Sequence, residues 1–190
     1  MRLGTLKRAK ALRLPMLCAA LLLTAACGAQ RTTETFSTMT APQLKPGLLD
    51  HAISEARSLR ARGARVWCVP FARNASGVEI RGNANTWWGS AHGTYARGRT
   101  PQVGAVMAFS GTRKLPMGHV AVVSKVISDR EIEINHANWK RNQISLGMSV
   151  IDISEQNDWS SVKVQSQPNA YGRAYPIDGF IYPVQVSSAI

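Results

Sequence analysis

The stretch Arg65–Arg73 reads RVWCVPFAR and places Cys68 directly before an apolar turn that contains a proline. Proline fits the first turn of a helix, because the backbone N–H that it lacks has no intrahelical partner there. The stretch therefore predicts a helix that starts near Cys68. Amide dipoles at a helix start favour a thiolate over a thiol, which makes this cysteine a candidate nucleophile. The plainer alternative is a buried cysteine that acts as a small apolar side chain.

The first 26 residues have the pattern of a secretory signal. Several basic residues precede the apolar segment 16–26, which is too short to span a membrane as a helix. The small residues before Cys27 are similar to a bacterial lipobox, although Thr24 stands where an aliphatic residue is usual. We expect residues 1–26 to be a signal peptide and Cys27 to carry the lipid that anchors the protein to a membrane. Cleavage shortly after Cys27, without a lipid, is the alternative.

The predicted processing leaves one cysteine thiol in the exported protein. Cys18 is removed with the signal peptide, and Cys27 is either acylated or lost, so Cys68 remains without a partner in a compartment where thiols usually form disulfides. An unpaired thiol there favours a reactive role. We expect the protein to lie in the periplasm or cell envelope.

Residues 27–47 are rich in Thr, Ser and Pro and lack an apolar period, which is typical of a flexible tether. The remaining residues, 48–190, are enough for one folded domain.

The charge balance is strongly positive, at a formal net charge of +12. Five basic residues and no acid lie in residues 1–26, so a processed chain keeps a charge of +7. This balance favours an anionic partner such as a nucleic acid, a membrane surface or a wall polymer, while an ordinary solvated surface is the alternative. Trp67, Trp139 and Trp159 fall in segments that we interpret as core, not among basic residues as in a base-stacking platform, so we expect no nucleic-acid partner.

Helical spacing of apolar residues predicts a helix over residues 48–62, and Asn83 as a helix cap predicts a second short helix over 83–93. After Pro101 the pattern changes to short apolar strands. These are expected at residues 103–109, 119–127, 131–138, 144–153, 162–165 and 180–184. Helices followed by a run of strands predict an α+β domain in which N-terminal helices pack on an antiparallel sheet.

Two of the predicted strands bring polar side chains together. The short polar segment 128–130 predicts a hairpin between the strand that His119 opens and the following strand. Because side chains alternate along a strand, His136 and Asn138 share one face, and the two glutamates of that strand lie on the other. One register places His119 opposite His136, and a neighbouring register places it opposite Asn138. Either side chain is then able to orient the imidazole of His119.

A thiol, an imidazole and an orienting group are the minimum set for acyl transfer by a cysteine. In this scheme the Cys68 thiolate attacks a carbonyl carbon, and its backbone N–H helps to bind the oxyanion. His119 holds the thiolate as an ion pair and later protonates the leaving amine. Alternatively, Cys68, His119 and His136 are three ligands of a zinc ion that has water in the fourth position.

Four motifs in order resemble the CHAP domain, a member of the NlpC/P60 group of papain-like cysteine hydrolases. They are the Cys68 stretch, PQVGAV at 101–106, GHVAVV at 118–123 and NHANW at 135–139, and the resemblance extends over about residues 63–184. It implies a papain-like fold and cleavage of amide or peptide bonds in peptidoglycan, either as an N-acetylmuramoyl-L-alanine amidase or as a peptide endopeptidase. It implies no metal ion and no other cofactor.

By position, Cys68 is similar to the family's nucleophile and His119 to its base. The family often has Glu where this chain has His136, with Asn two positions later, as at Asn138. A neutral histidine accepts the proton of the base's second nitrogen, but it does not stabilise an imidazolium as a carboxylate does. We therefore expect His136 and Asn138 to share the orienting role. Since a fold does not guarantee its chemistry, the alternative function is a non-catalytic lipoprotein that binds the cell wall.

Overall fold

The structure is a computed structural model that describes residues 45–186. The predicted signal peptide, the lipid site at Cys27 and all but the end of the predicted tether lie outside the described residues. No helix within residues 45–186 is long and apolar enough to cross a membrane.

The first two helices within residues 45–186 pack against each other. They are α1 (Pro46–Ala61) and α2 (Cys68–Ser76), so the helix predicted over 48–62 is confirmed and α2 begins at the predicted cysteine. α2 ends at Gly77, whose φ of +76° is the left-handed conformation common after a helix end. The helix predicted over 83–93 is shorter than expected. It consists of a 3₁₀ turn, η1 (Ala84–Thr86), followed by the single-turn helix α3 (Trp87–Ser90).

Seven strands form one sheet in which each neighbouring pair is antiparallel. The strands are β1 (Tyr95–Gly98), β2 (Val106–Phe109), β3 (His119–Ser128), β4 (Glu131–Ala137), β5 (Ile144–Asp152), β6 (Ser161–Gln167) and β7 (Ala170–Gln185). Their order is β1-β7-β2-β3-β4-β5-β6. The predicted α+β class with an antiparallel sheet is confirmed.

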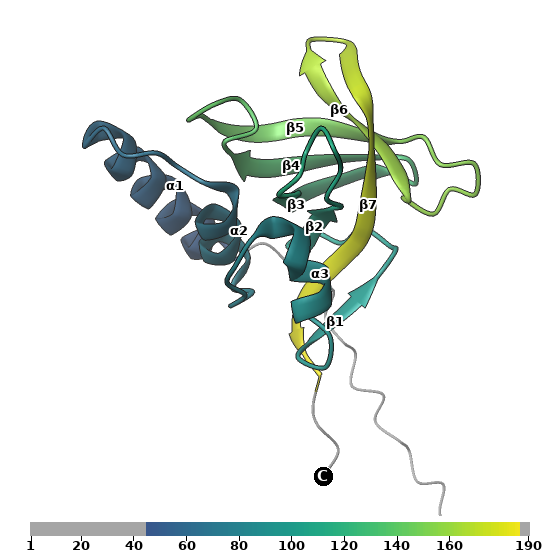
Figure 1. Ribbon diagram of the computed structural model, residues 1–190, viewed down its shortest axis with the longest axis horizontal. Helices are drawn as coiled ribbons and strands as arrows, with labels where there is room; N and C mark the ends of the chain where they lie inside the picture. The colour runs from purple at the N-terminus through teal and green to yellow at the C-terminus, as the bar shows by residue number, and fades with distance from the viewer. Residues whose placement is uncertain (1–44, 187–190) are drawn as a thin grey trace, which may run out of the picture. The chain divides into compact units, whose positions relative to one another are not determined.

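The long strand β7 closes the sheet into a barrel-like shape. Its first half pairs with β6 and its second half pairs with β2 and β1, so the chain returns to the start of the sheet (Figure 1). The sequence predicted only residues 180–184 of this strand, missed β1, and began β2 three residues too early. The sequence predicted N-terminal helices on an antiparallel sheet but did not predict this closure through β7.

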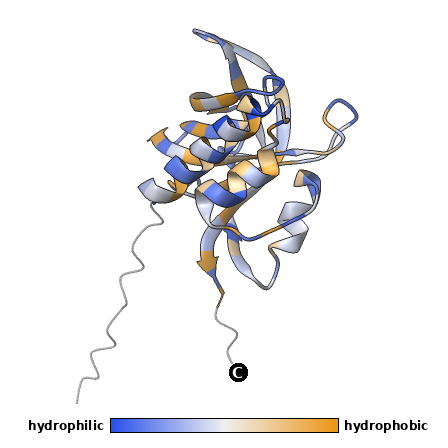
Figure 2. Ribbon diagram, turned by 90° about the vertical axis from the view of Figure 1, so that its left-hand side faces the viewer, coloured by the Kyte–Doolittle hydropathy of each residue, from blue (hydrophilic) through white to orange (hydrophobic). Residues whose placement is uncertain are grey.

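The sheet separates two apolar cores, because the strands carry buried residues on both faces. On β3, Val120 and Val122 face a cluster that includes the helices, whereas Ala121 and Val123 face the barrel interior. Both α1 and α2 carry hydrophobic and hydrophilic residues along their length, as Figure 2 shows, and they cover one side of the barrel. The same alternation places His119, the first residue of β3, on the interior side.

Gly118 allows two loops to meet next to His119. Its φ is +64°, and a Cβ at this position would lie 2.7 Å from the carbonyl oxygen of Phe109 and 2.8 Å from the backbone nitrogen of Asn85. That nitrogen donates a hydrogen bond to the carbonyl of Met117 at 2.9 Å. Any side chain at residue 118 would push the segment that leads into η1 away from the start of β3.

We expect Gly118→Ala to lower the free energy of unfolding by about 2–4 kcal/mol, since it combines a left-handed backbone with overpacking. The matched control is Gly63→Ala, where φ is +73° but nothing lies within 4 Å of the added Cβ. In this control the free energy of unfolding should fall by only about 1 kcal/mol, because only the cost of a left-handed backbone for alanine applies. Urea unfolding of both variants measures the difference, and equal losses would contradict the role of close packing at Gly118.

Candidate active site

A cleft of about 550 Å³ lies between the start of α2 and three loops. Its lining residues are Trp67, Cys68, Val69, Pro70, Gly82, Asn83, Ala84, Leu115, Met117, Gly118, His119 and Asn138. Three of the four predicted site residues, Cys68, His119 and Asn138, thus line one hollow although they are far apart in the sequence. The fourth, His136, is fully buried and contacts His119.

Cys68 is the first residue of α2, and its partly buried side chain packs at the edge of the helix-side core. Burial raises the pKa of the thiol above its ordinary value. Hydrogen bonds with the backbone of Val120, Val69 and Cys68 itself lower that pKa and so oppose part of the rise. Because Val120 directly follows His119, the contact holds the sulfur beside the start of β3.

His119 and His136 form a hydrogen-bonded pair, with 2.9 Å between Nε2 of His119 and Nδ1 of His136. The pairing of Val122 with Asn135 fixes the register of β3 and β4 near the site. Extended along the ladder, this register corresponds to the one that places His119 opposite Asn138, and not to the one that places it opposite His136. His136 therefore reaches the ring of His119 diagonally across the two strands.

A methionine on the next strand determines which nitrogen of each ring carries the proton. Nε2 of His136 lies 3.2 Å from the sulfur of Met148, and a thioether only accepts hydrogen bonds. We therefore assign the proton of His136 to Nε2, which leaves Nδ1 to accept a hydrogen bond from Nε2–H of His119. Nδ1 of His119 then holds a free lone pair, and this is the nitrogen that a general base needs.

Aromatic rings surround the histidine pair and exclude water from it. The ring of Trp139 lies 5.0 Å from that of His119 and 5.7 Å from that of His136, and Phe109 lies 5.6 Å from His119 on another side. Burial lowers the pKa of His136 to about 3. Burial also lowers the pKa of His119 well below its ordinary value, and electrostatic repulsion from His136 adds to this effect. Both imidazoles are neutral near pH 7.

These directions correct one expectation from the sequence. A raised thiol pKa and a lowered imidazole pKa favour a neutral thiol and a neutral base at rest, whereas we expected a thiolate–imidazolium ion pair between Cys68 and His119. If Cys68 acts as a nucleophile, a base would have to take its proton during the attack on the substrate.

Asn138 does not take the orienting role that the sequence suggested for it. β4 ends at Ala137, and Asn138 has a left-handed backbone with φ of +63°. Its Oδ1 accepts a hydrogen bond from the backbone N–H of Asn142 at 2.8 Å, and its own N–H donates to the carbonyl of Gln143 at 2.7 Å. Asn138 thus shapes the loop between β4 and β5, while His136 holds the ring of His119.

The zinc alternative finds no support in the arrangement of the side chains. Within residues 45–186, no three His, Cys, Asp or Glu side chains come together in a way that could hold a metal ion. Cys68, His119 and His136 accordingly do not form the three-ligand set that this alternative requires.

Residues 60–138 match the family model of the CHAP domain. The match assigns this segment, 79 of the 190 residues, to the CHAP family. The matched segment includes all four predicted site residues and supports an activity of the peptidoglycan hydrolase or amidase type, since CHAP domains are generally hydrolases that use cysteine and histidine. No curated protein matches the chain.

The sequence did not predict three of the residues around the site, namely Phe109, Met148 and the exposed Trp67. Phe109 pairs directly with His119 across β2 and β3, and the alternation of the segment 103–109 was a usable signal for it. Met148 lies on a strand with a bulge, so its approach to His136 has no simple sequence signal. Trp67 was expected in the core, but it is 50% exposed at the rim of the cleft.

We expect the rate of alkylation of Cys68 by iodoacetamide to rise steeply with pH and to show an apparent pKa above that of an ordinary thiol. The reason is that burial disfavours the thiolate and raises the pKa of the thiol, so less of the reactive form is present at a given pH than for an ordinary thiol. Measuring the alkylation rate by mass spectrometry between pH 5 and 10 tests this. A rate that stays high down to about pH 5 would indicate the ion pair instead.

Proposed function

We propose that this protein is a cysteine hydrolase of the cell envelope that cleaves amide or peptide bonds in the stem peptides of peptidoglycan. It acts either as an N-acetylmuramoyl-L-alanine amidase or as an endopeptidase. Cys68 is the nucleophile, His119 the general base and His136 the residue that orients His119. The observation that carries the proposal is the shared cleft of Cys68 and His119, with the ring of His119 fixed from behind by His136.

The first half-reaction follows from the tautomers of the two histidines. Nδ1 of His119 takes the proton from Sγ of Cys68 as the sulfur bonds to the carbonyl carbon of the substrate. The negative charge moves to the carbonyl oxygen, where the backbone N–H of Cys68 at the start of α2 donates to it. The imidazolium of His119 then protonates the leaving amine, the C–N bond breaks, and a thioester remains on Cys68.

The second half-reaction returns the enzyme to its starting state. Nδ1 of His119 removes a proton from water as the oxygen attacks the thioester carbon. The C–S bond then breaks, the proton returns from His119 to the sulfur, and the carboxylic acid product leaves. Throughout, Nδ1 of His136 accepts the hydrogen bond from Nε2–H of His119 and keeps the ring in place.

A thiol at a helix start that faces an imidazole on a sheet is a papain-like arrangement, and the proposal includes this finer fold relationship. It also includes export by the signal in residues 1–26, lipid attachment at Cys27 and a tether over residues 27–47. These features would hold the catalytic domain in the periplasm or envelope, within reach of the wall.

A non-catalytic wall-binding protein is the second candidate function. Trp67 and Met117 are 50% and 52% exposed on the rim of the cleft, and exposed apolar side chains of this size are common at binding sites. In this case the cleft would hold a wall peptide without cutting it.

Replacing Cys68 with Ala should lower the release of fragments from purified sacculi on the order of 10³-fold or more, because the nucleophile is lost. Iodoacetamide should inhibit the unmodified protein, and EDTA should have no effect. Mass spectrometry of the released fragments measures the activity and identifies the bond.

The control is binding of the Cys68→Ala variant to sacculi, which should persist if the variant is folded. Unchanged fragment release in this variant would remove the hydrolase proposal. Inhibition by EDTA together with resistance to iodoacetamide would contradict it as well.

A further inference from the structure

The loops around the cleft contain many more basic than acidic residues. Four segments supply most of its lining, namely residues 62–67, 77–84, 110–118 and 138–143. They contain the basic residues Arg62, Arg65, Arg81, Arg113, Lys114, Lys140 and Arg141, and their single acidic residue is Glu79. With seven basic residues and one acidic residue, these segments together carry a net charge of +6.

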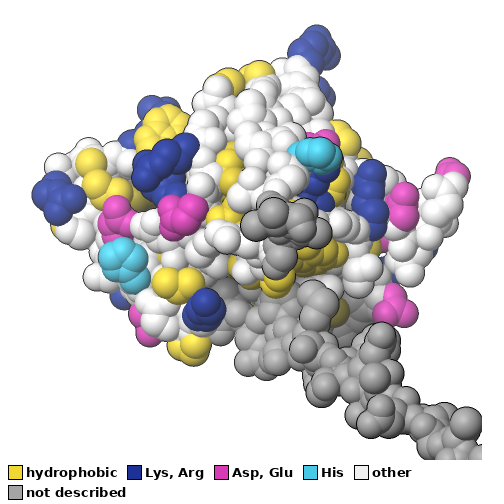
Figure 3. Space-filling view, turned by 90° about the horizontal axis from the view of Figure 1, so that it is seen from below, with side chains coloured by type: hydrophobic (Ala, Val, Ile, Leu, Met, Phe, Trp, Pro, Cys, Tyr) yellow, Lys and Arg dark blue, Asp and Glu magenta, His cyan; other side chains and the backbone are white. Residues whose placement is uncertain are grey.

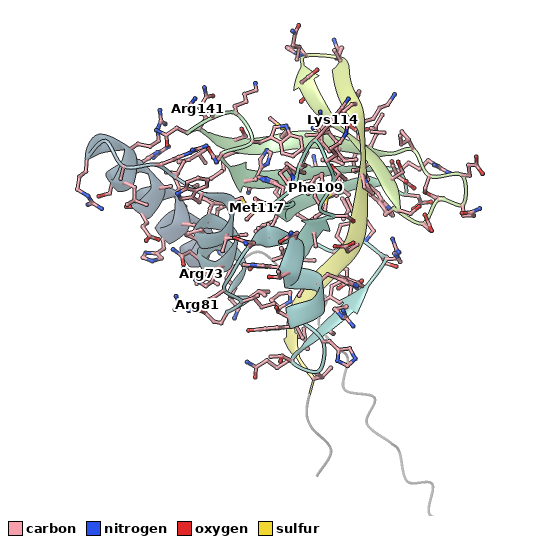
Figure 4. All side chains as sticks on the ribbon, in the orientation of Figure 1. Arg73, Arg81, Phe109, Lys114, Met117 and Arg141 are labelled. Atoms are coloured by element: carbon pink, nitrogen blue, oxygen red, sulfur yellow. The ribbon has the colours of Figure 1, made fainter. Side chains whose placement is uncertain are left out.

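One of these side chains contacts the lining of the cleft directly, and two others neighbour lining residues in the sequence. The guanidinium of Arg65 lies 4.1 Å from the ring centre of Trp67, which lines the cleft. Arg81 and Lys114 directly precede two other lining residues, Gly82 and Leu115. Arg81, Lys114 and Arg141, which are labelled in Figure 4, come from three different loops. We refer to Arg65, Arg81, Lys114 and Arg141, all of them exposed, as the basic rim.

The positive charge is not a general property of the domain surface. At the far end of the barrel, residues 128–130 and 152–160 carry Asp129, Asp152, Glu155 and Asp158 and the basic residue Arg130, and Arg99 lies beside Asp129 and Asp158. The face shown in Figure 3 has basic and acidic side chains interspersed. The excess of basic residues in the loops around the cleft is therefore local. It is expected to attract anionic ligands to the end of the domain that carries Cys68 and His119.

We propose that the basic rim selects stem peptides that carry free carboxylates near the scissile bond over peptides in which these carboxylates are amidated. The inference rests on the proposed function and names the substrate class of the same cleft. Basic side chains around a cleft raise the local concentration of anionic ligands, and arginine pairs with carboxylates in a bidentate way. A carboxamide has the same size but no charge, so it gains little from the rim.

The test uses two synthetic stem peptides of the same sequence, one with free carboxylates and one with carboxamides. At low salt the unmodified protein should cleave the acidic peptide with a kcat/KM about tenfold higher. The triple variant Arg81→Gln, Lys114→Gln, Arg141→Gln should lose this preference. The charge-matched control Lys45→Gln, Arg57→Gln, Lys125→Gln, whose residues are exposed outside the four segments, should keep it.

Equal kcat/KM for the two peptides would overturn the selection by the rim and leave the hydrolase function intact. If neither peptide is cut, fluorescence anisotropy with the Cys68→Ala variant decides. Tighter binding of the acidic peptide, lost in the rim variant, would support the rim and count against hydrolysis. Equal binding of both peptides would overturn the rim proposal.

A separate set of hydrogen bonds connects the β4–β5 loop to the segment before the nucleophile. Oδ1 of Asn142 accepts a hydrogen bond from the backbone N–H of Val66 at 2.9 Å, and the N–H of Asn142 donates to Oδ1 of Asn138 at 2.8 Å. Asn138 and Asn142 have left-handed backbones, with φ of +63° and +57°. Val66 is buried and lies two residues before Cys68, so the loop fixes the chain where it enters α2.

The geometry points to Asn142 as a positioning residue for Cys68, with Asn138 acting through it. Asparagine suits both positions, because it tolerates a left-handed backbone and offers a carbonyl oxygen. If this oxygen were removed, the buried N–H of Val66 would lose its hydrogen-bond acceptor. The segment that leads to Cys68 would then be able to shift. A shift of about 1 Å at a nucleophile lowers catalysis by about 10²-fold.

Asn142→Gly tests this role, since glycine tolerates the left-handed backbone and removes the side chain that carries the acceptor. We expect kcat to fall on the order of 10-fold to 10²-fold with little change in KM, and the alkylation rate of Cys68 to change as well. Asn142→Asp restores an acceptor oxygen and should rescue both. The matched control is Asn169→Gly in the turn between β6 and β7, where φ is +60°.

This control should leave kcat and the alkylation rate unchanged. An Asn142→Gly protein that is folded and reacts at Cys68 at the unmodified rate, with normal kcat, would overturn the positioning role. The alkylation readout needs no substrate, so it stands even if the proposed hydrolase function fails.

Discussion

The hydrogen bond between His119 and His136 is the interaction on which the proposed site depends. It joins the first residue of β3 to a residue near the end of β4, and Met148 of β5 completes the chain of contacts. Three neighbouring strands must therefore be in register before the base is oriented. The barrel interior supplies the apolar surroundings in which two neutral imidazoles are stable, and Trp139 covers both rings.

The use of histidine in place of a carboxylate behind the base has chemical consequences. A neutral imidazole orients His119 through a hydrogen bond, but it offers no negative charge to an imidazolium. In the proposed mechanism, the protonated state of His119 is therefore confined to the short interval between attack and departure of the amine. This agrees with the raised pKa of Cys68 and the lowered pKa of His119, which both favour the neutral state before substrate arrives.

Local patterns in the sequence predicted the parts of the site that depend on neighbouring residues. The start of α2 at Cys68, the start of β3 at His119 and the hairpin after Ser128 each follow from side chains within a few positions. The closure by β7 was not predictable in this way. Its first part contains glycine and proline and lacks a sustained apolar alternation, and its pairing with β6 and β2 is decided by long-range contacts.

The alternation of side chains along a strand also failed to predict the role of Asn138. Strand periodicity placed it beside His136, but its left-handed backbone takes it out of the strand and into the loop. Trp67 was misplaced for a related reason, since as the residue before α2 it belongs to neither a strand nor the buried face of the helix. The direction of a side chain at the end of a helix or strand depends on the backbone angles of one residue. The spacing of apolar residues in the sequence does not predict these angles.

The most direct test of the proposed chemistry is to trap the covalent intermediate. The protein is mixed with a stem peptide, quenched rapidly in acid and analysed by mass spectrometry of its proteolytic fragments. The mechanism predicts that the fragment containing Cys68 gains the mass of the acyl part of the substrate, and that hydroxylamine releases it as expected for a thioester. Turnover of the peptide without any such adduct, and with full activity after Cys68→Ser, would contradict the mechanism.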